Sequence, residues 1–372
     1  MRLYAAIVTQ PTNQPKTTAL QGLDKAKSKI EELEKKIDAA WQAITIRRQA
    51  DPVFDEEQFV FLAPEYFFSN QQHAQDRFFS QNVKRYVIAK LAALAKKYPK
   101  LLIIPGTVLW TKNAYEETVQ IGKRQMAAPL QNNQGRINRA KARIQESQKA
   151  FPKTNGFAQN RQDWTHSGPL NGLGLESSTN VQEKYLNDAD YYQTRIAQNV
   201  AYVCLGQKIV KYHKVGNYKE VNGEQGTIVF EPGKLRGRFK IGDVRYALEV
   251  CMDHALGVVT SDIGGSDDQP HVRIIVSDTT DNKPRTDDVV LLHSSTYKAG
   301  TYSTPNGPIQ LKTDPVVLGG GCKLIHTKPV DPTLTLYTVQ IDNKPHGINR
   351  KNTYVLSDTQ LPEPKHVYAH MA

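Results

Sequence analysis

Apolar and polar residues follow two different periods along the first part of the chain. Mostly apolar runs at Arg2–Gln10, Gln58–Phe68 and Lys100–Trp110 are typical of β-strands. Between them, apolar residues recur every three or four positions over 20–48 and 82–99, which indicates two amphipathic helices. Strands that alternate with helices in this order predict an α/β layered fold.

The periodicity fades from residue 111 to about residue 190. This stretch is rich in Gln, Asn, Lys, Arg and Ser, a composition that rarely builds its own core. We therefore interpret residues 111–190 as a polar insertion within a single domain of residues 1–372. A linker, a lid and a partner-binding arm all remain open roles for it.

Strands return after the insertion. The pattern predicts one hairpin over Gln198–Lys214 with its turn near Gly206, and a second over Gly237–Cys251 with its turn at Gly242–Asp243. Further apolar runs complete a strand-rich C-terminal part, and they include Val272–Asp278 and Val289–Ser295.

The composition argues against a membrane-spanning protein, a disulfide-rich secreted protein and a zinc protein. No apolar run approaches the roughly 18 residues that suggest a membrane span, and the N-terminus does not resemble a secretion signal. The cysteines Cys204, Cys251 and Cys322 are too few for a disulfide framework and lack the spacing of zinc sites. We expect reduced thiols, a cytoplasmic location, and neither a metal nor a cofactor.

The formal net charge is +11, but the basic residues are spread along the chain. The sequence contains none of the common nucleic-acid-binding motifs. We therefore expect a solvated basic surface and predict no nucleic-acid partner.

Three polar residues stand at the ends of apolar strands: Glu65, Lys214 and Cys251. Taken singly, each has a simpler explanation, as a surface carboxylate, an exposed lysine or a buried thiol. Together they can form a nucleophilic site, because a thiol attacks as the thiolate. A neighbouring cation such as Lys214 lowers the thiol pKa, and a neighbouring base such as Glu65 takes the proton.

The segments that hold these residues resemble motifs of the nitrilase (carbon–nitrogen hydrolase) superfamily. They are "FLAPEYFF", "IIPGT", "QNVAYVCLGQKIVKYHK" and "ALEVCMDHA", and they occur in the family's order within Arg2–Trp110 and Tyr191–Asp278. The resemblance implies a four-layer α-β-β-α sandwich with mixed sheets. It also implies a triad in which Glu65 is the general base, Lys214 stabilises the oxyanion and Cys251 is the nucleophile.

The same resemblance implies hydrolysis of a small-molecule C–N bond through a thioester, with an amide favoured over a nitrile as substrate. The backbone N–H of Met252 would be a second oxyanion donor, and Asp253 would fix the turn. Two alternatives remain open. One is transfer of the acyl group to an acceptor other than water. The other is a non-catalytic protein that binds an anionic partner through the basic insertion. A homo-oligomer is possible.

The chain departs from the family pattern in two places. A second glutamate is expected between the lysine and the cysteine, and Glu224 lies nearest to that place, slightly offset. After Asp278, the helix that the family usually has is shortened or missing. Further substrate-binding candidates beside the triad are Tyr66, His254, Thr279 and Thr280.

Overall fold

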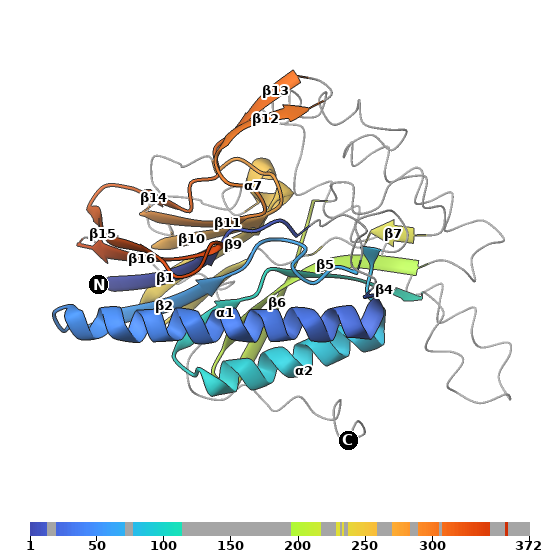
Figure 1. The fold of residues 1–372 in the computed structure, drawn as a ribbon, viewed down its shortest axis with the longest axis horizontal. Coiled ribbons are helices and arrows are strands. Elements are labelled where there is room, and N and C mark those ends of the chain that lie inside the picture. The colour runs from blue at the N-terminus through green and yellow to red at the C-terminus, as the bar shows by residue number, and fades with distance from the viewer. Residues whose placement is uncertain are drawn as a thin grey trace, which may run out of the picture.

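Two β-sheets pack face to face, and two long helices cover the outer face of the larger sheet (Figure 1). The computed structural model describes residues 1–12, 20–70, 77–113, 195–216, 228–230, 233, 237–258, 270–282, 289–304, 307–342 and 354–355. All statements on the structure concern these residues.

The larger sheet has nine strands in the order β15-β16-β1-β2-β3-β5-β4, and β6 and β7 also pair with β5. β1, β2 and β3 are parallel, whereas β5 runs antiparallel to β3, β4 and β6. The strands are β1 (Arg2–Val8), β2 (Glu57–Leu62), β3 (Leu101–Ile104), β4 (Thr107–Asn113), β5 (Arg195–Leu205), β6 (Lys208–His213), β7 (Ile228–Phe230), β15 (Cys322–Pro329) and β16 (Leu334–Ile341).

The smaller sheet has six strands in the order β14-β11-β10-β9-β8-β17. Because β9, β10 and β11 are parallel, their carboxyl ends lie at the same edge of the sheet. Its strands are β8 (Arg238–Ile241), β9 (Val244–Val250), β10 (Val272–Ser277), β11 (Val290–Ser295), β14 (Val316–Leu318) and β17 (Tyr354–Val355). The short helix α7 (Met252–Leu256) follows β9, and β12 (Gly300–Thr304) pairs with β13 (Gly307–Leu311).

The two long helices are α1 (Gly22–Ala50) and α2 (Gln81–Lys97). Each buries one apolar stripe against the nine-stranded sheet. The Ser80 hydroxyl caps α2 by accepting a hydrogen bond from the Val83 N–H at 3.3 Å. The buried stripes are Ala26, Ile30, Leu33, Ile37, Ala40 and Ile44 on α1, and Val83, Val87, Leu91, Leu94 and Ala95 on α2.

A second core fills the space between the sheets. Alternate residues of each strand contribute to it, since successive side chains of a strand point to opposite faces. Leu3 and Ile7 of β1 meet Leu248 of β9 and Ile274 of β10 in this core. One helical layer and two sheets are therefore present in the described part of the chain. The second helical layer of the expected four-layer sandwich remains a prediction.

The structure confirms the two helices and both hairpin turns, but two predicted boundaries are wrong. Residues 100–110 form two strands, because Pro105 and Gly106 interrupt the run between β3 and β4. Residues 111–113 belong to β4, where they pair with 195–197 of β5, and are not part of the insertion. Residues 114–190 of the predicted insertion lie outside the described residues. None of the described helices combines the length and apolar character needed to cross a membrane.

Gly106 permits a close approach of two backbone segments beside Glu65. Its φ is +76°, and a Cβ at this position would lie 2.0 Å from the carbonyl oxygen of Pro64. Such a separation is impossible for real atoms, so a side chain here would push the segment that carries Glu65 away from β4.

We expect Gly106→Ala to destabilise the fold more than Gly242→Ala does. Both glycines have positive φ, which costs an L-residue about 1–2 kcal/mol, but nothing lies within 4 Å of a Cβ at Gly242. The clash should add about 1–3 kcal/mol at Gly106. Urea unfolding of the two variants measures the difference, and equal losses would contradict the proposed close approach.

Candidate active site

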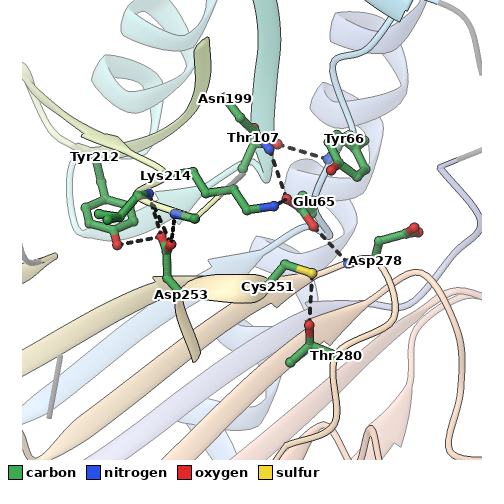
Figure 2. Close-up of polar contacts among 12 residues, drawn as sticks. Glu65, Tyr66, Thr107, Asn199, Tyr212, Lys214, Cys251, Asp253, Asp278 and Thr280 are labelled. Carbon is green, nitrogen blue, oxygen red and sulfur yellow. Dashed lines mark hydrogen bonds and ion pairs between the residues drawn. The ribbon is translucent and has the colours of Figure 1, made fainter. Parts of the chain in front are cut away.

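Three side chains that are far apart in the sequence meet at strand ends (Figure 2). Glu65 follows β2, Lys214 follows β6, and Cys251 follows β9. The Lys214 Nζ donates a hydrogen bond to Glu65 Oε1 at 2.8 Å, and both side chains are fully buried. The Cys251 thiol lies close enough to both charges for each to affect its pKa. The structure thus brings the sequence-predicted Glu–Lys–Cys set together.

Glu65 is held by three donors. Lys214 and the Asn199 side-chain amide both donate to Oε1, the latter at 2.9 Å. The backbone N–H of Asp278 donates to Oε2 at 3.2 Å. Burial removes water from a carboxylate, so these bonds supply the partners that water would otherwise provide.

Asn199 was not among the residues predicted for the site. In the β5–β6 hairpin, Val200 lies opposite His213, so Asn199 and Lys214 are the next pair. The Lys214 N–H donates to the Asn199 carbonyl at 2.9 Å. A register count from the turn at Gly206 would have placed Asn199 beside the lysine, and that was the missed signal.

Two backbone conformations at the site are unfavourable for their residue types. Among the described residues, the non-glycine residues with positive φ are Tyr66 (φ 59°) and Cys251 (φ 46°). Tyr66 directly follows Glu65, and its N–H donates to the Thr107 hydroxyl at 3.0 Å. The Cys251 N–H donates to the Val276 carbonyl at 2.9 Å. Strain of this kind persists where the surrounding structure enforces it, and it concentrates at functional sites.

The Cys251 thiol is buried and hydrogen-bonded. Burial raises its pKa well above the ordinary range, and the negative charge of Glu65 raises it further. Lys214, the Thr280 hydroxyl and the Asp278 backbone N–H lower this pKa, but by less. The Thr280 Oγ1 lies 2.9 Å from the Sγ. Of the two routes to a thiolate, proton transfer to a neighbouring base fits this environment better than a resting thiolate beside a cation.

Asp253 links α7, the helix that follows Cys251, to the segment that carries Lys214. Its carboxylate accepts hydrogen bonds from the Tyr212 hydroxyl at 2.7 Å and from the N–H groups of Val215 and Gly216 at 3.0 and 2.7 Å. Burial raises the pKa of Asp253 to about 7, although these donors and Lys214 lower it. The carboxylate that was predicted to fix its own turn therefore holds the residues immediately after Lys214.

The remaining predicted site residues have distinct surroundings. The Tyr66 ring has the Lys214 Nζ 5.8 Å and the Arg77 Cζ 4.8 Å from its centroid. His254 is buried, and its Nδ1 is 2.7 Å from the Glu249 carboxylate.

Thr279 is half-buried beside Thr280. Met252 occupies the first position of α7, where a backbone N–H has no acceptor within the helix. The predicted second glutamate, Glu224, lies outside the described residues.

The other cysteines do not join this site. Cys204 is fully buried in the core under the long helices, and burial alone raises its pKa. Cys322 is half-buried on β15, where burial and Asp342 raise its pKa to about 11. Within the described ranges, no group of three His, Cys, Asp or Glu side chains is placed to hold a metal ion.

We expect Asp253→Asn to cost about 1–3 kcal/mol of stability, because an amide group would face backbone donors that it cannot all satisfy. Tyr212→Phe removes a single hydrogen bond to the same carboxylate and should cost only about 0.5–1.5 kcal/mol. Denaturant unfolding of both variants measures the two losses. A stable Asp253→Asn protein would show that this carboxylate does not hold the lysine segment.

Comparisons with known proteins find similarity among solved structures. No protein-family model matches the chain, and no curated protein matches it. The chain is similar to a carbon-nitrogen hydrolase from Helicobacter pylori G27, with 11% identity, a TM-score of 0.43 and coverage of 91% of this chain and 88% of that chain. It is also similar to a variant of an amidase from Nesterenkonia AN1, of the nitrilase superfamily, with 11% identity, a TM-score of 0.39 and coverage of 91% and 90%.

A third similar structure is the glutamine-dependent NAD+ synthetase from Acinetobacter baumannii, with 9% identity and a TM-score of 0.43. The match covers 94% of this chain but only 49% of the synthetase, so the chain spans about half of that protein's length. Similarity at these identities and scores does not identify the function of this chain.

Proposed function

We propose that this protein is a cysteine-dependent hydrolase of the nitrilase superfamily. Its substrate would be a small molecule with a non-peptide C–N bond, an amide in preference to a nitrile. One observation carries the proposal: a buried thiol, a buried carboxylate and a buried ammonium meet at three strand ends, and the thiol stands in a strained strand-to-helix turn.

In the first step, the Cys251 thiol passes its proton to Glu65 while the Sγ attacks the amide carbon. The new C–S bond converts the carbonyl oxygen into an oxyanion. The Lys214 ammonium and the Met252 N–H would stabilise that charge, and loss of one such donor typically costs about 10²–10³ in rate.

The charge balance of the site favours this assignment. At rest, the Lys214 ammonium is paired with the Glu65 carboxylate. When Glu65 takes the thiol proton it becomes neutral, and the negative charge appears on the substrate oxygen. The ammonium then has a new partner, so the buried site neither gains nor loses net charge during the attack.

The second half of the reaction returns each group to its starting state. The C–N bond breaks as the nitrogen takes the proton from Glu65, and ammonia or an amine leaves a thioester on Cys251. Glu65 then removes a proton from water, and the resulting hydroxide attacks the thioester carbon. The C–S bond breaks, the acid is released, and the proton on Glu65 returns to the thiolate.

The segment after β10 would contribute two groups to this chemistry. The Asp278 N–H contacts both Glu65 and the thiol, and the Thr280 hydroxyl contacts the Sγ. Thr280 would thus support the developing thiolate, a more direct role than the lining of a pocket. The four-layer sandwich and the single domain over residues 1–372 are further parts of the proposal.

The direct test is intact-mass measurement of the protein incubated with a panel of amides and nitriles. Cys251→Ala should abolish product release, because no other described thiol lies beside Glu65 and Lys214. Glu65→Gln should lower both acylation and thioester hydrolysis, because Glu65 is the base in both half-reactions, whereas the wild type should carry an acyl adduct of defined mass on Cys251 during turnover. That mass would identify the acyl group.

Cys322→Ala is the matched control, since it removes a half-buried thiol from the distant strand β15. It should leave turnover and adduct formation unchanged. Turnover that survives in Cys251→Ala would refute the proposed mechanism, whichever substrate supports it.

Thr280→Val tests the hydroxyl contact with the nucleophile. Valine keeps the shape but removes the hydrogen bond that lowers the thiol pKa. We expect the pKa to rise, so that alkylation of Cys251 by iodoacetamide at a given pH slows by about tenfold, the equivalent of one pKa unit. Thr280→Ser should restore the rate. Identical pH profiles for the valine variant and the wild type would exclude this role.

A further inference from the structure

The short helix α7 makes contacts with two buried carboxylates. One belongs to its own residue Asp253, which binds the N–H groups of Val215 and Gly216. The other belongs to Glu249 of β9, whose carboxylate lies 2.7 Å from the Nδ1 of His254. Glu249 is fully buried, and His254 is only 4% exposed. The chemistry proposed for the thiol uses neither member of this second pair.

The Glu249–His254 pair spans the strained turn at Cys251. Glu249 is the second-last residue of β9 and His254 is the third residue of α7, so Cys251 lies between them. The φ of Cys251 is 46°, a value that a non-glycine residue keeps only where the surrounding structure enforces it. The His254 N–H also donates to the Cys251 carbonyl at 2.9 Å. Together these contacts fix the direction in which α7 leaves β9.

The pair lies on the face of the smaller sheet that points away from the larger sheet. Leu248 and Val250 belong to the core between the sheets, so Glu249 points to the opposite face. The Cys251 side chain instead belongs to the core between the sheets. A substrate that reaches the thiol therefore approaches it from the other side, and we do not expect it to touch the His254 ring.

A second histidine lies in the same row of this face. His293 of β11 is opposite Ile275 of β10, and Ile275 is opposite Glu249 of β9. The His293 Nε2 is 2.6 Å from the Ser277 hydroxyl oxygen. Burial lowers the pKa of His293 to about 3, and His254 contributes to the shift. The His293 ring is thus neutral near pH 7 and cannot balance the Glu249 carboxylate, as His254 can.

A buried pair of this kind is an inefficient way to stabilise a fold. Removing two charged groups from water is costly, and apolar residues of similar volume often give equal or greater stability. A hydrogen bond supplies direction, which an apolar contact lacks, because the N–H group has to point at its acceptor. The contribution of Glu249 and His254 is therefore geometric.

We propose that Glu249 and His254 are positioning residues for the nucleophile. By closing the turn around Cys251, they keep the thiol beside Glu65 and the Met252 N–H directed at the oxyanion. This role rests on the proposed function, because it concerns the same thiol and the same reaction. Without the pair, the turn would relax toward an ordinary φ, and the thiol would leave its buried position.

The test is alkylation of the full chain by iodoacetamide at one pH, followed by mass analysis of each cysteine peptide. The double variant Glu249→Met/His254→Leu replaces both polar partners with apolar residues of similar volume, so the fold should persist. Burial is the largest of the causes that raise the pKa of Cys251. A released thiol should therefore have a lower pKa and react at least about tenfold faster, the equivalent of one pKa unit.

Three controls separate positioning from loss of the fold. Cys204 is fully buried in the other core, so it should stay protected while the variant is folded. Glu249→Gln keeps a carbonyl oxygen that can accept from the His254 ring, and it should keep the wild-type rate at Cys251. Tyr246→Phe removes a different hydrogen bond of β9, the one at 2.8 Å to Gln58, and should also keep that rate.

Turnover gives the second readout, with any amide that proves to be a substrate. The double variant should lose at least about tenfold in kcat although its thiol is alkylated faster, because misaligned oxyanion donors slow the reaction. If no substrate is found, a selective rise in alkylation at Cys251 would still support the positioning role. The two proposals therefore fail separately.

Three results would overturn the positioning role. They are a folded double variant that is alkylated at Cys251 at the wild-type rate, equal rises at Cys251 and Cys204, and a Glu249→Gln protein that reacts as fast as the double variant. The second would show that the pair only stabilises the fold, and the third that the direction of the hydrogen bond does not matter.

Discussion

The buried ion pair between Lys214 and Glu65 constrains the rest of the structure. Removing two charges from water costs several kcal/mol per ion, and the cost is recovered only with good geometry and further hydrogen bonds. In this protein, both sheets supply the hydrogen bonds that offset this cost. Asn199 and Lys214 come from the β5–β6 hairpin of the larger sheet, while the Asp278 N–H follows β10 of the smaller one. A shift of one sheet against the other would break a bond to a buried charge.

Cys251 is tied to the same constraint by a second buried carboxylate. Asp253 lies two residues after Cys251, and it binds the N–H groups of the two residues after Lys214. The strained turn at Cys251 and the lysine segment therefore move together or not at all. In the proposed mechanism, a rigid frame of this kind would hold the donors in place before the oxyanion forms, which is the condition for effective electrostatic stabilisation.

Much of this site was predictable from the sequence. Glu65, Lys214 and Cys251 stand at strand ends and within recognisable motifs, and Asn199 could have been found by counting the hairpin register. The Asp278 N–H could not, because a backbone amide has no side-chain signature. The Thr280 contact depends on the path of the chain after β10. The break between β3 and β4 was missed because the apolar run continues through Pro105 and Gly106.

The pairing of β4 with β5 determines where the chain can accept insertions and deletions. Asn113, the last residue of β4, lies directly opposite Arg195, the first residue of β5. The two residues that the 114–194 segment joins thus lie side by side in the sheet, as the ends of a short hairpin turn do. The entropy of closing such a loop grows only slowly with its length. Insertion or loss of sequence between these two residues can therefore accumulate over evolution while the arrangement of Glu65, Lys214 and Cys251 keeps its geometry.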